Sequence, residues 1–459
     1  MAEPYKVIFK WSKGGNEQGK LTAISCEEEN IPADKTWPGR VINTFIQLKT
    51  DEVQKACLTV NKSNTLQLKK GGFLYMDVGC WLDGHQTFGL VCGEDAMVCG
   101  YTPGPGVGAP KSSGNALLDE FTRLPGVSVL FWEKIPAPHP ADPKRLCLIL
   151  PDMHVAEAPP PGHPRPPDDP KWGKTEFGAW DIDPHTYDAW AKRDIFNSRA
   201  SMAAMIAFLS MIQRLGRASQ ITLVQLGDMY ELWAARELFF RRSEDANVHM
   251  IAGGVKEVGE WVGRTHLLYP ELFQEFDRCA ARGIKMLFLH GNHDDYLSRP
   301  EVVAAANAYI QTEPTRYGGD APSVASTTVY PRQKEVSQDS VFIEHGQRCD
   351  QYNRDGETAG YEKTNDAVSP GFFMSIPILL GMDPRKVEST RRPTFVVGAA
   401  AMWCIRQRDF GLYVMGHTHA PDLHRVEVFH KREEIHYLEG PEGMLVETKE
   451  VTPLEGVSR

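Results

Sequence analysis

The sequence predicts an α/β fold with a β-rich accessory domain at its N-terminus, and three observations support this prediction. Short apolar runs that end at glycine or polar residues recur after about residue 145, as in residues 285–289, and runs of this kind are typical of buried strands. Residues 188–215 carry apolar side chains at helical spacing between two such runs, which is the pattern of a parallel strand–helix–strand unit. Residues 5–135 show only short strand-like runs.

Length and composition are those of an ordinary globular protein. The chain has 459 residues, of which 42% are hydrophobic and 24% are charged, and this length suggests about two to three units. Its 50 basic and 60 acidic residues give a net charge of -10. That charge argues against a surface that binds nucleic acid throughout, although a local basic groove would be hidden in the average.

The sequence predicts a cytoplasmic protein. The first residues lack the apolar segment of a secretory signal, and no apolar stretch reaches the roughly 18 residues that a membrane span needs. The nine cysteines are widely spaced and form no C-x-x-C pair. They therefore indicate reduced thiols rather than a disulfide framework or a zinc ribbon.

The expected domains divide the chain near residue 140. Residues 1–140 form the β-rich accessory domain of unknown role, residues 141–445 form the second domain, and residues 446–459 are a tail. Within the first domain, strand-like residues 73–78 and 87–92 flank Asp83-Gly84, which suits a tight turn. We therefore expect these two runs to form a hairpin.

Strands and helices alternate along the second domain. A Pro-rich insertion at 156–190 excludes regular helix and central strand, and a disordered surface loop and an active-site lid are the alternatives for it. Pro300 suits the first turn of a helix, because its missing N–H costs nothing there. The expected strands are 146–150, 220–226, 285–289, 340–344 and 411–415, the expected helices are 188–215, 258–282 and 301–311, and 424–429 and 435–438 are expected as antiparallel closing strands.

Five of these strands end in side chains that bind metals. Because the carboxyl ends of neighbouring parallel strands meet at one edge of a sheet, we expect these side chains to converge. Imidazole and carboxylate groups suit divalent first-row metals, and side chains at i and i+2 of an extended backbone point the same way. The five ends are Asp152-x-His154, Gly227-Asp228, Gly291-Asn292-His293-Asp294, His345-Gly346 and Gly416-His417-x-His419.

In this order the five motifs resemble the calcineurin-like metallophosphoesterase superfamily, whose pattern is D-x-H, G-D, G-N-H-[DE], H and G-H-x-H. The resemblance covers residues from about 145 to 440. Residues 226–233, 345–350 and 416–424 look most like the UDP-2,3-diacylglucosamine pyrophosphatase branch. That branch usually has arginine in place of His293, and it lacks both the N-terminal domain and the Pro-rich insertion.

The resemblance implies a four-layer α/β/β/α sandwich with two divalent metal ions, with Mn²⁺ the first expectation and Fe, Zn or Ni as alternatives. A metal-bridging hydroxide would attack phosphorus, His293 would stabilise charge or protonate the leaving oxygen, and Asp294 would orient His293. The implied ligands are Asp152, His154 and His419 for one metal, Asn292, His345 and His417 for the other, and Asp228 as the bridge.

Three further residues are candidates for substrate binding, and each has a simpler alternative. Arg348 suits bidentate contact with a phosphate, or it is an ordinary solvated arginine. His424 contacts the site, or it is a surface strand histidine. Tyr230, together with Glu231 and Trp233, lines the pocket, or these three side chains pack at a helix start.

The predicted function is metal-dependent hydrolysis of phosphate ester or pyrophosphate bonds. The substrate would be a phosphate-containing small molecule or a lipid-linked one, and apolar residues 372–380 would hold an acyl chain or form a core helix. The alternatives are a nuclease or cyclic-nucleotide phosphodiesterase, which the net charge disfavours, and a non-catalytic scaffold protein. A scaffold should have lost ligands, whereas every motif position is filled here.

Overall fold

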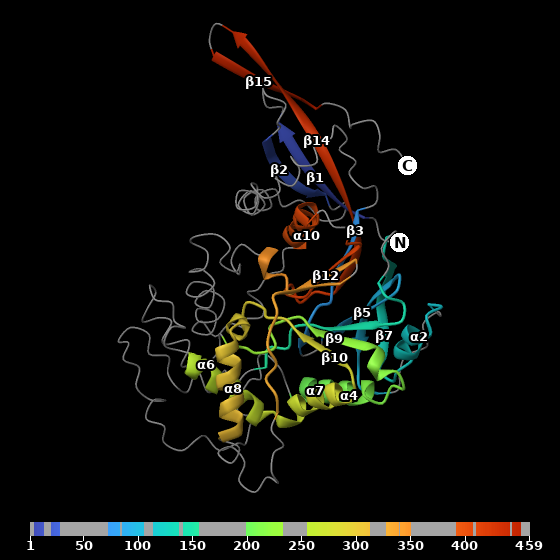
Figure 1. Cartoon of the computed structure of the whole chain (residues 1–459). Helices are drawn as coiled ribbons and strands as arrows, with labels where there is room; N and C mark the ends of the chain where they lie inside the picture. Colours follow the sequence, from blue (N-terminus) through green and yellow to red (C-terminus); the bar gives the residue numbers. More distant parts are fainter. Residues whose placement is uncertain are drawn as a thin grey trace.

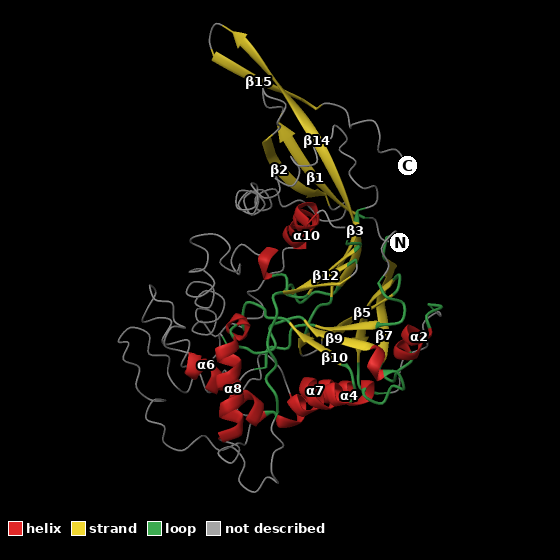
Figure 2. Cartoon of the chain, viewed as in Figure 1, coloured by secondary structure: helices red, strands yellow, loops and turns green. Residues whose placement is uncertain are grey.

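The structure is a computed structural model of the chain, and the segments that it describes are given at the end of this paragraph. In these segments the protein is an α/β structure with two mixed sheets and helices (Figures 1 and 2). The described residues are 4–12, 20–27, 72–82, 85–104, 113–136, 141–155, 199–232, 255–312, 327–338, 340–349, 392–406, 410–440 and 443–450.

The seven-stranded sheet contains three of the five predicted strands. Its order is β10-β9-β8-β5-β6-β7, and β4 pairs with β5 off this path. Strands β8, β9 and β10 are parallel, whereas β5, β6 and β7 are antiparallel. The bounds are β4 Trp81–Leu82, β5 His85–Cys92, β6 Asp95–Tyr101, β7 Val127–Lys134, β8 Leu146–Leu150, β9 Ile221–Gln225 and β10 Lys285–Phe288.

The eight-stranded sheet contains the other two predicted strands. Its order is β11-β12-β13-β3-β14-β1-β2, and β15 pairs with β14. Strands β12, β13 and β3 are parallel neighbours. The bounds are β1 Tyr5–Ser12, β2 Lys20–Glu27, β3 Phe73–Asp77, β11 Glu335–Gln338, β12 Val341–Glu344, β13 Leu412–Met415, β14 Asp422–Gly440 and β15 Gly443–Glu450.

Helices pack on both sheets, and their bounds agree with much of the sequence prediction. The helix that begins at Pro300 is confirmed. The helical region predicted for 258–282 is two helices, because Pro270 begins a new one after Tyr269. The bounds are α2 Ala116–Thr122, α4 Arg199–Ile212, α6 Val255–Leu268, α7 Pro270–Ala281, α8 Pro300–Thr312 and α10 Arg392–Arg406, with 3₁₀ turns η2 Ala218–Gln220, η3 Asp295–Ser298 and η4 Gln347–Cys349.

Alternation along the strands divides the apolar side chains among three cores. On β3, Phe73 and Tyr75 pack with residues of α10, whereas Leu74 and Met76 face the core shared with the seven-stranded sheet. On β9, Leu223 likewise joins the core that contains α4, α6, α7 and α8. Successive strand side chains point to opposite faces. Each sheet therefore packs helices on one face and contacts the other sheet through the other.

The strand pairing contradicts the prediction that residues 1–140 form a separate β-rich domain. Strand β3 lies between β13 and β14, and β5 pairs with β8. All five residues of β3 are buried, as in a strand covered on both faces. The described strands of the first 140 residues are therefore built into the same two sheets as the rest of the chain. The sequence shows their apolar pattern but not their pairing partners.

The hairpin prediction is also corrected. Strand β3 belongs to the eight-stranded sheet, and the partner of His85 and Gln86 across Asp83-Gly84 is the short strand β4. The turn residues themselves lie outside the described residues. The residues before the turn thus contain two strands, β3 and β4, that belong to different sheets. The sequence alone does not show this division, because β4 has only two residues.

At the C-terminus, the two predicted closing strands are one long strand. Strand β14 continues to Gly440, and its antiparallel partner β15 begins at Gly443. The glycines mark the change of direction, as is usual for turns. The charged residues between 429 and 435 do not break the strand.

Several predictions fall outside the described residues. These are the Pro-rich insertion at 156–190, the apolar stretch 372–380, Trp233 and residues 451–459 of the predicted tail. Residues 446–450 of that predicted tail are instead part of strand β15. Among the described helices, none has the length and apolar character to cross a membrane. The seven cysteines whose side chains are described are free thiols: Cys26, Cys80, Cys92, Cys99, Cys147, Cys279 and Cys349.

Candidate metal centre

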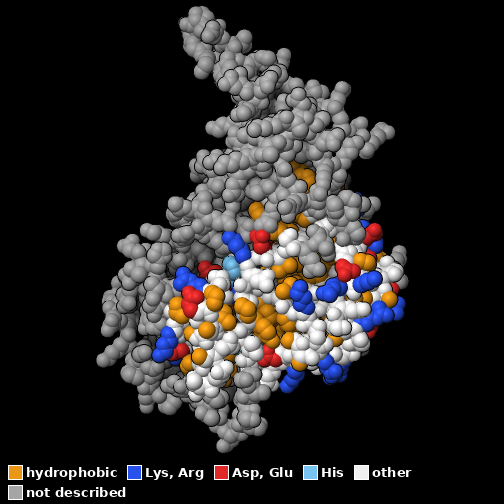
Figure 3. Space-filling view, viewed as in Figure 1, with side chains coloured by type: hydrophobic (Ala, Val, Ile, Leu, Met, Phe, Trp, Pro, Cys, Tyr) orange, Lys and Arg blue, Asp and Glu red, His pale blue; other side chains and the backbone are white. Residues whose placement is uncertain are grey.

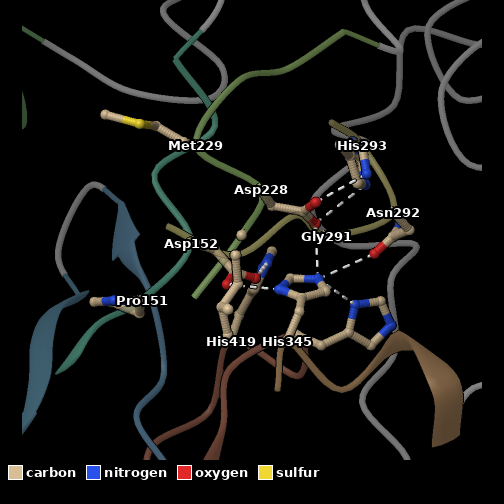
Figure 4. Close-up of polar contacts among 12 residues, drawn as sticks. Pro151, Asp152, Asp228, Met229, Gly291, Asn292, His293, His345 and His419 are labelled. Carbon is tan, nitrogen blue, oxygen red and sulfur yellow. Dashed lines mark hydrogen bonds and ion pairs between the residues drawn. The ribbon is translucent and has the colours of Figure 1, made fainter. Parts of the chain in front are cut away.

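The five predicted strand ends meet at one place, and both sheets contribute to it (Figure 4). The loops after β8, β9 and β10 come from the seven-stranded sheet, and those after β12 and β13 come from the eight-stranded sheet. The site is thus formed where two sheets face each other rather than along one sheet edge. The side chains brought together are Asp152, His154, Asp228, Asn292, His293, His345, His417 and His419.

The first group consists of Asp152, His154 and His419. The Nε2 atom of His419 lies 3.0 Å from Oδ2 of Asp152, and the Nε2 atoms of His154 and His419 are 3.3 Å apart. Asp152 and His154 are buried, and the His419 side chain is 19% exposed. This is the set of ligands implied for one metal.

The second group consists of Asp228, His345 and His417, with Asn292 beside it. The Nε2 atom of His345 lies 3.0 Å from Oδ2 of Asp228 and 3.1 Å from Nδ1 of His417. The Oδ1 atom of Asn292 is also 3.1 Å from His345 Nε2. These four side chains are the ligands implied for the second metal together with the bridge.

Asp228 lies between the two groups. Its Oδ2 atom is 3.0 Å from His345 in the second group and 3.9 Å from Nε2 of His154 in the first. A second connection joins Oδ1 of Asp152 to Nδ1 of His345 at 3.4 Å. Asp228 thus lies close to an imidazole of each group.

The residues present fit divalent metal ions. Two nitrogens that bind one ion at about 2.1 Å lie about 3.0–3.4 Å apart for bond angles between octahedral and tetrahedral values. The facing nitrogen pairs, at 3.1 and 3.3 Å, match this separation. Both oxygens of Asp152 are buried and lie against imidazole rings, Oδ2 at 3.0 Å from His419 and Oδ1 at 3.4 Å from His345. Buried carboxylates of this kind are normally paired or bound to metal, so these groups could hold metal ions.

The charges at the site favour ionised carboxylates. Burial by itself raises the pKa of Asp228, but the neighbouring rings of His345 and His293 outweigh it and hold the pKa well below its usual value. The pKa of Asp152 is also lowered, because His345 and His419 outweigh its burial. Both side chains are therefore available as anionic ligands near neutral pH.

Backbone strain is concentrated in the proposed ligands. Four non-glycine residues of the described chain have positive φ angles: 46° at His154, 46° at Asp228, 28° at His417 and 57° at His419. Such conformations cost of order 1–3 kcal/mol each and occur where the surrounding structure enforces them, often at functional sites. All four belong to the predicted ligand set.

Gly291 permits two of the loops to approach closely. A Cβ atom at this position would lie 2.0 Å from Oδ1 of Asp228. The same oxygen accepts a hydrogen bond of 2.8 Å from the backbone N–H of His293. The absence of a side chain at Gly291 therefore allows Asp228 to reach the loop that carries Asn292 and His293.

The role predicted for Asp294 is corrected. Its carboxylate accepts hydrogen bonds from the backbone N–H groups of Gly291, Met229 and Asp228, at 2.8, 3.0 and 3.2 Å. Among its contacts in the described residues, none is to the ring of His293. Asp294 thus holds two motif loops together by their backbones, and it does not orient the proposed acid.

Glu231 takes the orienting role instead. Its Oε2 atom is 2.8 Å from Nδ1 of His154 and 2.8 Å from Nδ1 of His293. Because a carboxylate only accepts, both rings donate from Nδ1 and keep Nε2 for the site. The sequence suggested two roles for Glu231, lining the pocket or packing at a helix start. Neither is the observed one, because no local pattern indicates that a carboxylate contacts two histidines 62 and 77 residues away.

Two of the three substrate-binding candidates, Tyr230 and His424, make contacts elsewhere. Tyr230 is buried, and its hydroxyl lies 2.7 Å from Nε2 of His266, so the packing alternative describes it. His424 pairs with Asp422 and lies against the ring of Tyr5, and its described contacts include none of the metal-ligand residues. The side chain of Arg348 lies outside the described residues.

Comparison with known proteins adds no identification. No protein-family model matches the chain, and no curated protein matches it. The functional conclusion therefore rests on the five motifs and on the geometry of the site.

Proposed function

We propose that this chain is a calcineurin-like metallophosphoesterase that hydrolyses phosphate ester or pyrophosphate bonds with two divalent metal ions. The observation that supports the proposal most directly is the position of Asp228 between two buried groups of imidazole and carboxylate ligands. Paired ions that share a carboxylate are suited to phosphoryl chemistry. We also infer that the two sheets and their helices form the four-layer α/β/β/α sandwich of that superfamily.

In this proposal the ligands keep the roles expected from sequence. Asp152, His154 and His419 hold one ion; Asn292, His345 and His417 hold the other. Mn²⁺ is the proposed metal, because nitrogen and oxygen ligands without thiolates suit a relatively hard first-row ion. When bound, the ions polarise the phosphoryl group and lower the pKa of coordinated water.

His293 is the proposed general acid. Its ring is buried, and its Nε2 atom lies 4.0 Å from Oδ2 of Asp228, the proposed bridging ligand. Glu231 accepts a hydrogen bond from the Nδ1–H group of His293, which leaves Nε2 to face the place where a phosphoryl oxygen would bind. A histidine in this position stabilises developing charge or protonates the leaving oxygen.

The proposed substrate is a phosphate-containing small molecule or a lipid-linked one. A nuclease remains the less favoured alternative: in Figure 3, basic side chains on the described part of the visible face stand at separate places with acidic ones among them. Nucleic-acid binding usually uses a continuous basic surface. A panel of nucleotide sugars, lipid-linked pyrophosphates, cyclic nucleotides and DNA would distinguish these classes.

The test compares metal content and turnover in two variants. Asp228→Asn keeps the size of the side chain but weakens the bridge, so it should lose bound Mn²⁺ in elemental analysis and also lose hydrolysis of bis-p-nitrophenyl phosphate. His293→Ala should keep the metal and lower kcat by about 100-fold or more, the usual contribution of a general acid. Asp95→Asn is the control, because Asp95 is a buried carboxylate bonded to Trp132.

Three results would contradict the proposal. A wild-type protein that binds no Mn²⁺, or that binds it and hydrolyses no phosphate ester, would remove the assigned activity, and the second result would favour the scaffold alternative. Equal metal loss in Asp228→Asn and His293→Ala would show that His293 is a metal ligand like Asp228 and not the general acid.

A further inference from the structure

The segment after β3 contacts two of the metal-binding loops, although it lies far outside the motif region. Asp77 ends β3 and is paired with Met415 at the end of β13 and with Asp422 at the start of β14. The loop that joins Met415 to Asp422 carries His417 and His419. It therefore begins and ends beside Asp77.

The side chain of Asp77 is bonded to the middle of that loop. One carboxylate oxygen accepts a hydrogen bond from the hydroxyl of Thr418, and the other accepts one of 2.9 Å from the backbone N–H of Gly79. Asp77 and Thr418 are both almost fully buried. Thr418 stands between His417 and His419, so the bond fixes the residue that separates the two proposed ligands.

Further contacts hold the same segment against the site. The backbone N–H of Val78 donates to the carbonyl of Met415 at 2.9 Å, and that of Trp81 donates to the carbonyl of Asp152 at 2.8 Å. The Sγ atom of Cys80 lies 3.7 Å from the carbonyl oxygen of His419. Residues 78–81, which follow β3, thus contact both the loop of Asp152 and the loop of His417 and His419.

The loop needs such support because of its backbone. His417 and His419 both have positive φ angles, and non-glycine residues persist in that region only where their surroundings enforce it. The hydroxyl of Thr418 between them is held by a buried carboxylate from another strand. No residue within the motif G-H-x-H itself supplies that carboxylate.

We propose that Asp77 is a positioning residue that holds the loop of His417 and His419 in its metal-binding conformation through Thr418. It follows that the N-terminal part of the chain completes the metal centre. The inference rests on the proposed metal-dependent function, since it assigns Asp77 to the loop that carries two of the proposed ligands.

The test is a double-mutant cycle on Mn²⁺ affinity, measured by calorimetric titration of the full chain. Asp77→Ala and Thr418→Val should each weaken binding about 10–100-fold, as loss of a group that orients a ligand does. The double variant should lose no more than about the larger single effect, because both changes remove one bond. Thr418→Ser keeps the hydroxyl and should stay within about threefold of wild type.

Asp95→Ala is the matched control, since it removes a buried carboxylate that lies away from the loop. Unchanged affinity in Thr418→Val, additive losses in the double variant, or equal losses in Thr418→Ser and Thr418→Val would each overturn the proposal. If Asp77→Ala fails to fold, the Mn²⁺ affinities of Thr418→Val and Thr418→Ser still show whether the hydroxyl of Thr418 is needed for metal binding.

Hydrogen exchange of the backbone amides at 416–420 separates this proposal from the proposed function. Faster exchange in Asp77→Ala than in Asp95→Ala supports the positioning role, even if the wild-type protein binds no Mn²⁺ and the proposed function fails. Equal exchange in the two variants overturns the positioning role, even if the wild-type protein binds metal and is active.

Discussion

Replacing Glu231 with glutamine should reduce metal affinity and turnover together. The carboxylate is buried and accepts hydrogen bonds from Nδ1 of both His154 and His293, with contacts of 2.8–2.9 Å. Glutamine has nearly the same size but no charge and only one acceptor oxygen. The change therefore weakens both bonds without opening a cavity.

The size of the effect follows from the two bonds. A hydrogen bond to a charged group contributes about 1.5–3 kcal/mol, and a neutral one contributes about 0.5–1.5 kcal/mol. Each histidine thus loses about 1–1.5 kcal/mol of orienting interaction, which corresponds to about tenfold. The weaker hydrogen bond to His154 should raise the Mn²⁺ dissociation constant about tenfold. The weaker hydrogen bond to His293 should lower kcat at saturating Mn²⁺ by a similar factor.

The assay measures Mn²⁺ binding by calorimetry and the hydrolysis of bis-p-nitrophenyl phosphate over a series of Mn²⁺ concentrations. Glu275→Gln serves as the control, because Glu275 is a buried glutamate on α7 that bonds to Gln213 and Arg278 instead. If Glu231→Gln changes both the dissociation constant and kcat by less than twofold, Glu231 does not orient the two rings as inferred.

Two further predictions concern the packing around the site. Gly291→Ala places a methyl group only 2.0 Å from Oδ1 of Asp228, so it should lower the free energy of unfolding by about 1–3 kcal/mol and reduce Mn²⁺ content. Wild-type metal content would contradict this prediction. His266 should make the protein less stable in acid, because burial and then the charge of Arg332 hold its pKa well below the usual value. Below about pH 6.5 the unfolded chain binds a proton that the folded chain does not, so stability is lost as the pH falls. Urea unfolding at pH 7.5 and 5.5 should show a smaller loss for His266→Gln than for wild type, and an equal loss would refute the assignment.

Local patterns in the sequence were sufficient for five strands and for the candidate ligands that follow them. Apolar runs of about five residues predicted β8, β9, β10, β12 and β13, because side-chain spacing reflects backbone geometry. The polar residues directly after these runs are the ones that the structure brings together, from Asp152 to His419. Residue type and order along the chain are local properties, and the chemistry of the ligand set could be inferred from them.

The partners of these residues could not be inferred in the same way. Asp294 and Glu231 are both acidic residues near a motif, yet one bonds to backbone N–H groups and the other bonds to two imidazoles. Which contact a buried carboxylate makes depends on the donors that packing places around it, and those donors come from distant parts of the chain.

The sequence by itself therefore determined which strands end in candidate metal ligands, and the tertiary structure decided how those ends are supported. Strand β3 has an apolar pattern that suits many sheets, and only its pairing with β13 and β14 places Asp77 beside Thr418. The physical reason is that periodicity depends on the backbone of a few neighbouring residues, whereas strand pairing depends on burial across the whole fold.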